Sequence, residues 1–445
     1  MLAPSQPQTR LRRWTFGSPL RGLLSLRYAV LRAWTAGGGI IAGLVQTFVF
    51  ARVLDPHTFS LFILVGALGV SMWLFDLGFS RILFVRMRER FLAGQDLLDM
   101  GAQVNAVAMF YVALIAIASL AVIAGAVLFA GIGALGSVEL GLFFFFSAFN
   151  LTWFVFRNAS LAVDDYIYFE TLESCRRAAH ILLMLTVLAG LPFAAFIGLI
   201  NIGWAVLIVL ASTRLIGRRA LTPQFGGLVA RLRTFFRDNR DAALRTGIHA
   251  SGEVYIHGIL YIAVPLSFGL GAPTIVADTV LKIFLGTLSL CTAACDLLVP
   301  RQTAAYAARD RRTLIRATLL GVALCALPAL AIVGILVLDA GRLFAVLLGN
   351  AATVPASVTP ILGVLLAAGV IKTAPAFLLA YTGYFKEVAW LSVANVALMT
   401  AAIAVGTVLR VDMIGLLAIY AGVFVVAALL YAGAAWRGPV HAVHE

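Results

Sequence analysis

Charged residues are scarce in this sequence. Only 12% of its 445 residues are Asp, Glu, Lys or Arg, about half the share of a soluble globular protein. Hydrophobic residues make up 62% of the chain, and the mean hydropathy is +1.01. Because one aqueous core cannot hide so much apolar surface, the composition excludes a soluble protein and predicts an all-α polytopic membrane protein.

Cysteine, lysine and acidic residues are also few. The four cysteines, Cys175, Cys291, Cys295 and Cys325, lie within or beside apolar stretches, which favours packing and excludes a disulfide framework. Only three of the 33 basic residues are Lys, and 20 acidic residues leave a net charge of +13. The arginines lie mostly between apolar stretches, so we expect contacts with membrane lipids and no nucleic-acid partner. No cofactor and no metal site is expected.

Apolar stretches of about twenty residues can cross the bilayer as helices. The stretch 174–213 is divided before residue 193, because Pro192 cannot continue a helix. The sequence therefore predicts about twelve transmembrane helices, near residues 28–51, 59–80, 101–130, 138–160, 174–190, 193–213, 246–270, 274–299, 314–337, 357–382, 387–409 and 411–433.

Arginine placement predicts the orientation of these helices. Arginines crowd the first 27 residues and alternate connections, above all the segment 214–245, whereas the opposite connections hold only Arg52, Arg342 and Arg410. Basic residues remain on the cytoplasmic side, so both termini and segment 214–245 are expected in the cytoplasm, with the chain in a bacterial inner membrane. Residues 1–27 lack the apolar region and cleavage site of a signal peptide and are expected as a cytoplasmic tail.

The basic loop predicted at 214–245 divides the chain near its middle. It separates a first lobe of six helices, 28–213, from a second, 246–433, which a tail of residues 434–445 follows. Each half has a proline turn before its second helix, at Pro56 and at Pro273, so the offset is 273 − 56 = 217 residues. Two such repeats are typical of transporters, and we expect no enzyme activity.

Ionisable residues within the apolar stretches are the candidates for function, because each costs at least ~2.5–3.5 kcal/mol on insertion scales. His249, Glu253 and His257 are spaced four apart in the seventh helix, one turn after Arg245. That spacing places them along one stripe, which we predict to line a cavity. The alternative is a hydrogen-bond network between helices. A metal site is disfavoured, because the spacing differs from that of the HExxH motif.

Three further cations lie in other predicted helices. Lys282 has Asp278 one turn before it as an alternative, structural partner, and Lys372 lies in an otherwise uncharged run. Arg32 is in the first helix, and the 217-residue offset aligns it with His249. We therefore expect Arg32 and His249 to face each other across one cavity.

The remaining acidic residues are expected to have structural or solvated roles. Asp296 lies near the end of the eighth helix and is expected to cap it or to pair with Arg301. A group of four is interpreted as solvated charge in a cytoplasmic loop: Asp164, Asp165, Glu170 and Glu173. The run Gly37–Gly39 in the first helix predicts a bend or a close backbone approach.

One segment resembles a known family. ARVLDPHTFSLFILVGALGVSMWLFDLGFSRILFVRMRER, residues 51–90, resembles the second-helix region of the O-antigen and exopolysaccharide repeat-unit flippases of the multidrug/oligosaccharidyl-lipid/polysaccharide (MOP) superfamily. The matching pattern is an Arg and a proline turn before the helix, then a DLGF-type end followed by arginines. The resemblance implies two six-helix lobes around a central cavity, as in multidrug and toxin extrusion (MATE) transporters.

The function that this resemblance implies is the flipping of isoprenoid-diphosphate-linked oligosaccharide repeat units to the periplasmic leaflet by alternating access, for surface polysaccharide such as the O-antigen of lipopolysaccharide. A polysaccharide polymerase and a chain-length regulator are the protein partners it suggests. Arg32, Lys282 and Lys372 are the candidate diphosphate ligands, with Arg245 at the cytoplasmic mouth, while Glu253 and the two histidines could couple transport to protons or cations.

Two other functions compete with this interpretation. A MATE-type cation antiporter would need acidic cavity residues, and the first predicted helix contains none. A membrane enzyme acting on lipid-linked sugars is disfavoured, because no paired carboxylates and no Ser-His-Asp set lie in an exposed loop.

Overall fold

The computed structural model describes residues 19–76, 78–129, 133–224 and 226–442, and within these ranges the chain forms helices and no strand. The first half contains eight α-helices and one 3₁₀ turn: α1 (Pro19–Val53), α2 (Pro56–Ser71), η1 (Met72–Asp76), α3 (Phe79–Leu92), α4 (Leu98–Phe129), α5 (Ala134–Ala148), α6 (Asn150–Ala162), α7 (Tyr166–Leu188) and α8 (Phe193–Gly217).

The second half contains seven α-helices and ends in a π-helical turn: α9 (Leu228–Gly258), α10 (Leu260–Phe268), α11 (Ala272–Ala307), α12 (Arg311–Leu348), α13 (Val358–Tyr381), α14 (Phe385–Val408), α15 (Met413–Ala435) and η2 (Trp436–Val440). The predicted all-α fold is thus confirmed.

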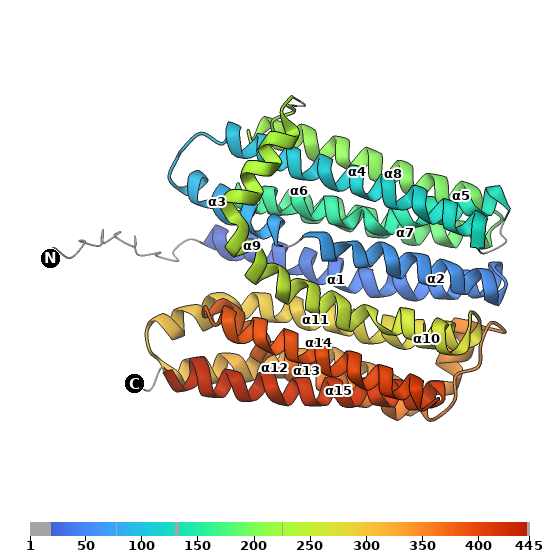
Figure 1. Cartoon of the computed structure of the whole chain (residues 1–445). Helices are drawn as coiled ribbons and strands as arrows, with labels where there is room; N and C mark the ends of the chain where they lie inside the picture. The colour runs from blue at the N-terminus through green and yellow to red at the C-terminus, as the bar shows by residue number, and fades with distance from the viewer. Residues whose placement is uncertain (1–18, 77, 130–132, 225, 443–445) are drawn as a thin grey trace.

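The helices fit a multi-pass membrane protein. Ten of the described spans are long and apolar enough to cross a bilayer. Two further predicted spans correspond to α7 and to the α9–α10 pair, which carry more charge and run alongside the others (Figure 1). Length and composition therefore support ten of the predicted twelve crossings among the described residues, and the other two stay a prediction.

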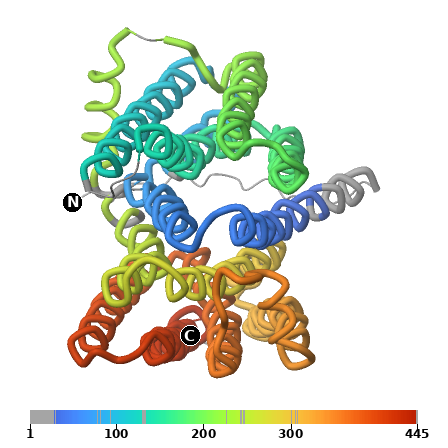
Figure 2. Tube along the Cα trace, turned by 90° about the vertical axis from the view of Figure 1, so that its right-hand side faces the viewer, coloured from blue at the N-terminus to red at the C-terminus, as the bar shows by residue number. Residues whose placement is uncertain are grey.

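The chain folds into two lobes that lie side by side. Helices α1–α8 form one group and α10–α15 the other, while α9 passes from the first to the second (Figures 1 and 2). Most of one hydrophobic core comes from residues 42–235 and most of a second from residues 256–428. The first is rich in edge-to-face aromatic pairs such as Phe62 with Phe143 and Phe193, at 5.2 and 5.1 Å between ring centroids, a geometry that adds to the gain from burial.

Proline turns open the second helix of each lobe, as the repeat predicts. Pro56 is the first residue of α2, and Pro273 is the second residue of α11. At such positions the missing N–H of proline breaks no helical hydrogen bond. Asp55 caps α2 by accepting hydrogen bonds from the backbone N–H groups of His57 and Thr58, both at 3.0 Å. Hydrogen bonds from the side chain of Thr58 and then from its backbone hold the pKa of the Asp55 carboxyl below the usual value.

Several predicted boundaries were wrong. The segment 214–245 is mostly helical, because α8 continues to Gly217 and α9 begins at Leu228. The tail predicted at 1–27 lies outside the described residues up to residue 18, and α1 already begins at Pro19. Helix α7 begins at Tyr166 and not near residue 174, which turns a predicted acidic loop into part of a helix.

The two lobes are joined at the end of the bundle where α1 ends and α2 begins. Arg52 donates hydrogen bonds to the backbone carbonyls of Val346 and Leu347 at 2.7 and 3.4 Å, and the Ser60 hydroxyl donates to the carbonyl of Gly271 at 3.1 Å. Ile275, from the second half, is fully buried in the core of the first. We call these contacts the seal, and the opposite end, where α1 begins and α15 ends, the open end (Figure 1).

Candidate transport cavity

Three connected compartments lie between the lobes. The outer compartment has a volume of about 1270 Å³, an N-lobe pocket about 500 Å³ and a C-lobe pocket about 250 Å³. Arg32, Phe154 and Arg157 line both the outer compartment and the N-lobe pocket. His257 is shared by the two pockets, and Tyr381 by the C-lobe pocket and the outer compartment. The compartments therefore form one central cavity.

The cavity reaches the surface at the open end. Its outer compartment is lined by the second half of α3, the end of α6, the first half of α9 and the ends of α11 and α13. Arg240 and Phe385 on its border are exposed. Since the seal joins the lobes at the other end, the outer compartment opens toward the open end.

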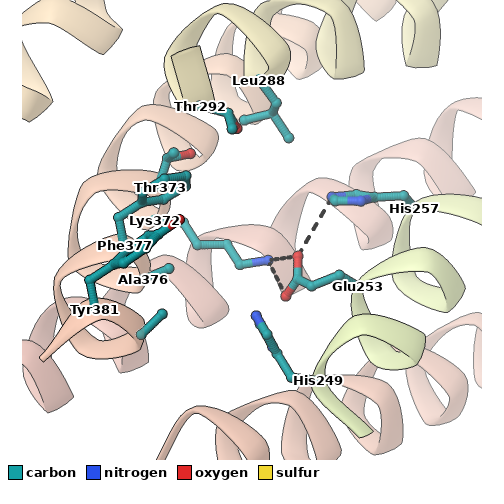
Figure 3. A pocket seen from close by; sticks show the side chains of 11 residues that line it. His249, Glu253, His257, Leu288, Thr292, Lys372, Thr373, Ala376, Phe377 and Tyr381 are labelled. Atoms are coloured by element: carbon teal, nitrogen blue, oxygen red, sulfur yellow. Dashed lines mark hydrogen bonds and ion pairs between the residues drawn. The ribbon is translucent and has the colours of Figure 1, made fainter. Parts of the chain in front are cut away.

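The C-lobe pocket brings four of the predicted site residues together. Lys372 donates from Nζ to both carboxylate oxygens of Glu253, at 2.7 and 2.9 Å, across the gap between α13 and α9 (Figure 3). His257 lies one turn further along α9, with Nε2 4.0 Å from the same carboxylate. His249 Nδ1 lies 2.6 Å from the Ser392 hydroxyl oxygen. The stripe of α9 thus lines a cavity and also bonds to neighbouring helices.

The N-lobe pocket contains a second charged cluster, which the sequence interpretation missed. Glu170 on α7 is only 3% exposed and accepts hydrogen bonds from Arg157 on α6, at 2.7 and 3.1 Å, and from the Thr35 hydroxyl on α1, at 3.1 Å. The interpretation of Glu170 as solvated charge is wrong. Asp165 is likewise buried and pairs with Arg214 at 2.6 Å, whereas Asp164 is half exposed and pairs with Arg88.

Glu173 completes this cluster one turn further along α7. Arg176 and Arg177 both donate to its carboxylate, Arg177 from Nε at 2.8 Å. Arg176 also lies 4.5 Å over the Trp204 ring, within the lobe, whereas Arg177 lines the N-lobe pocket. A Cβ atom on Gly38 or Gly39 would come within 3.5 to 3.7 Å of the Arg177 side chain. These are ordinary van der Waals distances, so the Arg177 side chain lies against the glycine run but the predicted close backbone approach is not shown.

Arg32 joins the two lobes at the cavity. Its guanidinium lies 3.5 Å from the Asp296 carboxylate of α11, so the predicted partner of Asp296, Arg301, was wrong. Arg32 and His249 were expected to face each other across one cavity. They line different parts of it, Arg32 the outer compartment and the N-lobe pocket and His249 the C-lobe pocket.

The last two predicted residues lie apart from these clusters. Lys282 is 2.7 Å from the Asp278 carboxylate and 3.0 Å from the Thr47 hydroxyl of α1, so the structural alternative holds, and it lines none of the three compartments. The side chain of Arg245 lies outside the described residues.

The missed cluster has a signal in the sequence. Glu170, Glu173 and Arg177 are spaced by three and four residues, the spacing of one helical face, and an acidic residue four positions before a basic one is typical of a helix. Had the predicted helix begun at residue 166, where α7 begins, the sequence would have predicted these three residues on one helical face beside the cavity.

Comparison with solved structures places the fold among MATE-type transporters. No protein-family model and no curated protein matches the sequence. An outward-facing multidrug resistance MATE family transporter of the MOP superfamily is similar over 96% of this chain and 97% of its own, with a TM-score of 0.62 and 15% identity. An inward-facing structure of such a transporter covers 94% and 99%, with a TM-score of 0.60 and 14% identity.

A third similar structure differs in the polarity of its binding pocket. A MOP superfamily transporter from Pyrococcus furiosus, described with a reverse polarity of the binding pocket that suggests a different function, covers 94% of this chain and 96% of its own, with a TM-score of 0.58 and 14% identity. The chain thus has the fold of MATE/MOP transporters and is a multi-pass membrane protein.

Proposed function

We propose that the protein flips isoprenoid-diphosphate-linked oligosaccharide from the cytoplasmic to the periplasmic leaflet of a bacterial inner membrane. The observation that carries this proposal is the charge of the outer compartment. Five arginines line it against three carboxylates: Arg32, Arg86, Arg157, Arg237 and Arg240 against Glu89, Asp238 and Asp296. An anionic diphosphate is attracted to such a wall.

The pairing of the carboxylates also favours an anionic substrate. Glu170, Glu173 and Glu253 in the two pockets and Asp296 in the outer compartment each lie within 3.5 Å of an Arg or Lys. A cationic substrate would have to displace these partners, whereas Arg86 and Arg240 have no carboxylate partner among the described residues. In the Pyrococcus furiosus transporter a reversed pocket polarity is taken to suggest a different function, and the excess of arginines in the outer compartment of this chain supports the proposal by the same reasoning.

The size of the cavity fits a large head group. The outer compartment alone, at about 1270 Å³, exceeds the roughly 300–1,000 Å³ of sites for drug-sized ligands. The glycan and diphosphate would occupy the cavity while the isoprenoid tail stays in lipid.

Arginine placement assigns the open end to the cytoplasm. With that orientation the structure is inward-facing and ready to load substrate from the cytoplasmic leaflet. A membrane potential that is negative inside favours outward movement of the diphosphate by ~2.3 kcal/mol per charge per 100 mV. A polymerase and a chain-length regulator would then receive the exported unit.

A MATE-type antiporter of cationic drugs is the competing function, because the fold comparison favours it equally. Transport into proteoliposomes separates the two. The substrates are polyprenyl-diphosphate oligosaccharide, extracted from membranes of cells that carry this gene, and the cationic dye ethidium. We expect the lipid-linked glycan to become inaccessible to an external glycosidase and ethidium not to accumulate. Accumulation of ethidium without glycan movement would refute the proposal.

Substitution of the outer arginines tests the role of the cavity. An Arg86→Gln, Arg240→Gln double variant should transport the lipid-linked glycan about tenfold more slowly or worse, because two charge-assisted contacts to phosphate are lost. Arg342→Gln is the matched control, since Arg342 is exposed near the sealed end and lines none of the compartments.

A further inference from the structure

We propose that the N-lobe pocket is the binding subsite for the sugar rings of the substrate, separate from the arginines of the outer compartment that hold the diphosphate. This inference rests on the proposed function. It assigns different parts of one cavity to the two chemically different parts of the head group.

The first argument is an aromatic wall. Trp73 from η1 and Phe154 from α6 pack with ring centroids 4.7 Å apart, and both are partly exposed at the pocket. Trp153 borders the same pocket. Pyranose rings present weakly positive C–H groups on their faces, and the negative faces of aromatic rings attract such groups. A simple inorganic anion would gain nothing from three aromatic rings.

The second argument is the mixture of donors and acceptors beside that wall. Three arginines and two glutamates line the pocket: Arg32, Arg157, Arg177, Glu170 and Glu173. Because the two carboxylates are held by arginines and by Thr35, their positions are fixed before a ligand arrives. Sugar hydroxyls donate and accept at once, so they can bond to both members of such ion pairs. The glutamates would repel a simple anion in this pocket, and the arginines would repel a simple cation.

The third argument is an indole N–H without a partner. Trp153 is only 5% exposed, and its Nε1 makes no hydrogen bond to any described residue. Buried donors are nearly always paired, and an exception calls for a reason. Nearby Asn150 lines the pocket and uses its amide N–H to bond the Ser147 carbonyl at 3.0 Å, which leaves its amide oxygen as an acceptor. The indole nitrogen has almost no accessible surface, so a ligand hydroxyl in the pocket would become its partner after a small shift of the side chains around it.

The position of the pocket agrees with this division. It lies further from the open end than the outer compartment and is connected to it through Arg32, Phe154 and Arg157. A diphosphate held by Arg86 and Arg240 would leave the attached sugars pointing inward, toward the aromatic wall.

Equilibrium binding to the full-length protein in nanodiscs tests the assignment. The two probes are undecaprenyl diphosphate without sugar and the native polyprenyl-diphosphate oligosaccharide extracted from cells that carry this gene. Wild-type protein should bind the glycosylated lipid at least about tenfold more tightly than the bare one, since a stacked ring and several hydrogen bonds are added. Equal affinities would overturn the inference.

Tryptophan variants with a matched control test whether the N-lobe pocket is responsible for the preference for the glycosylated lipid. Trp73→Leu should reduce the ratio of the two affinities about fivefold or more, and Trp153→Phe, which keeps a ring but loses the N–H, about two- to fivefold. Trp390→Leu, on an exposed surface of α14 outside the three compartments, should leave the ratio unchanged. Because each variant serves as its own control through the bare lipid, a general loss of folding lowers both affinities and is recognised.

Variants of the outer arginines distinguish a failure of this inference from a failure of the proposed function. Arg86→Gln with Arg240→Gln should weaken both probes equally and keep the ratio. If the tryptophan variants also keep the ratio, the glycan subsite is refuted while flipping stands. If wild-type protein binds neither probe, the proposed function itself fails.

Discussion

The two lobes hold their charged groups differently. In the N-lobe pocket, Glu170 is 3% exposed and Glu173 is 13% exposed, and arginines from α6 and α7 hold both. In the C-lobe pocket, Glu253 is 25% exposed and pairs with one lysine between two histidines. Guanidinium groups are planar and fix a carboxylate in one geometry, whereas an ammonium is a point charge on a flexible stem. The N-lobe cluster therefore suits a fixed recognition surface, and the C-lobe cluster suits a contact that can be rearranged.

Removal of the arginine partner in the N-lobe should have the largest effect on stability. Arg157→Ala leaves the buried Glu170 carboxylate with only Thr35, and loss of one member of a buried pair costs about 3–5 kcal/mol. The free energy of unfolding in detergent, from titration with sodium dodecyl sulfate, measures this loss. Adding Glu170→Gln to Arg157→Ala should recover part of it.

The equivalent change in the C-lobe should cost less. Lys372→Ala leaves Glu253 unpaired, but water reaches this carboxylate, so we expect a loss of about 2 kcal/mol in the same titration. A cost equal to or above that of Arg157→Ala would contradict the difference between the lobes. The double variant Lys372→Met, Glu253→Gln, with no charge left in the pair, should be close to wild type in stability.

A glycine at the junction of the lobes gives a smaller effect. A Cβ on Gly286 of α11 would lie 2.6 Å from the Cγ1 atom of Ile40 on α1, and such overpacking costs about 1–2 kcal/mol. Thermal unfolding of Gly286→Ala measures it. Gly203→Ala on α8 has open space around the new methyl group and should be neutral or slightly stabilising. Unchanged stability of both variants would show that the lobes adjust freely at this contact.

The ion pair that joins the two lobes at the cavity should matter least for stability. Arg32 and Asp296 are 3.5 Å apart and 22% and 32% exposed, so Arg32→Gln should cost below about 1 kcal/mol. A larger loss in unfolding free energy would show that this partly exposed pair stabilises the protein as a buried ion pair does.

Different parts of this structure were predictable to different degrees. The spans followed from hydropathy, because the bilayer imposes one length and one polarity on every crossing helix. The stripe from His249 to His257 was recognisable because charge is conspicuous in an apolar run. Its partner Lys372 is 119 positions from Glu253, and no local pattern reports such a contact.

The N-lobe cluster was missed for a related reason. The sequence alone does not distinguish charged residues that are buried in ion pairs from charged residues in water. Glu170 and Glu173, close to two further acidic residues, were therefore interpreted as part of a solvated loop. The basic segment before residue 245 was misread likewise, although Phe235 and Asn239 lie one turn apart on a buried face of α9. In both segments the helical spacing of the residues indicates a buried face, but the many charged residues favoured the interpretation as a loop.

The seal has one further consequence, which concerns acidity. Its polar contacts join Arg52 and the Ser60 hydroxyl to backbone carbonyls. Arginine stays protonated in proteins, and neither a hydroxyl nor a carbonyl titrates in the physiological range. The contacts inside the C-lobe pocket, such as that of Glu253 with Lys372, do join ionisable side chains. The polar contacts of the seal therefore do not depend on the protonation state of a side chain, whereas those of the cavity walls do.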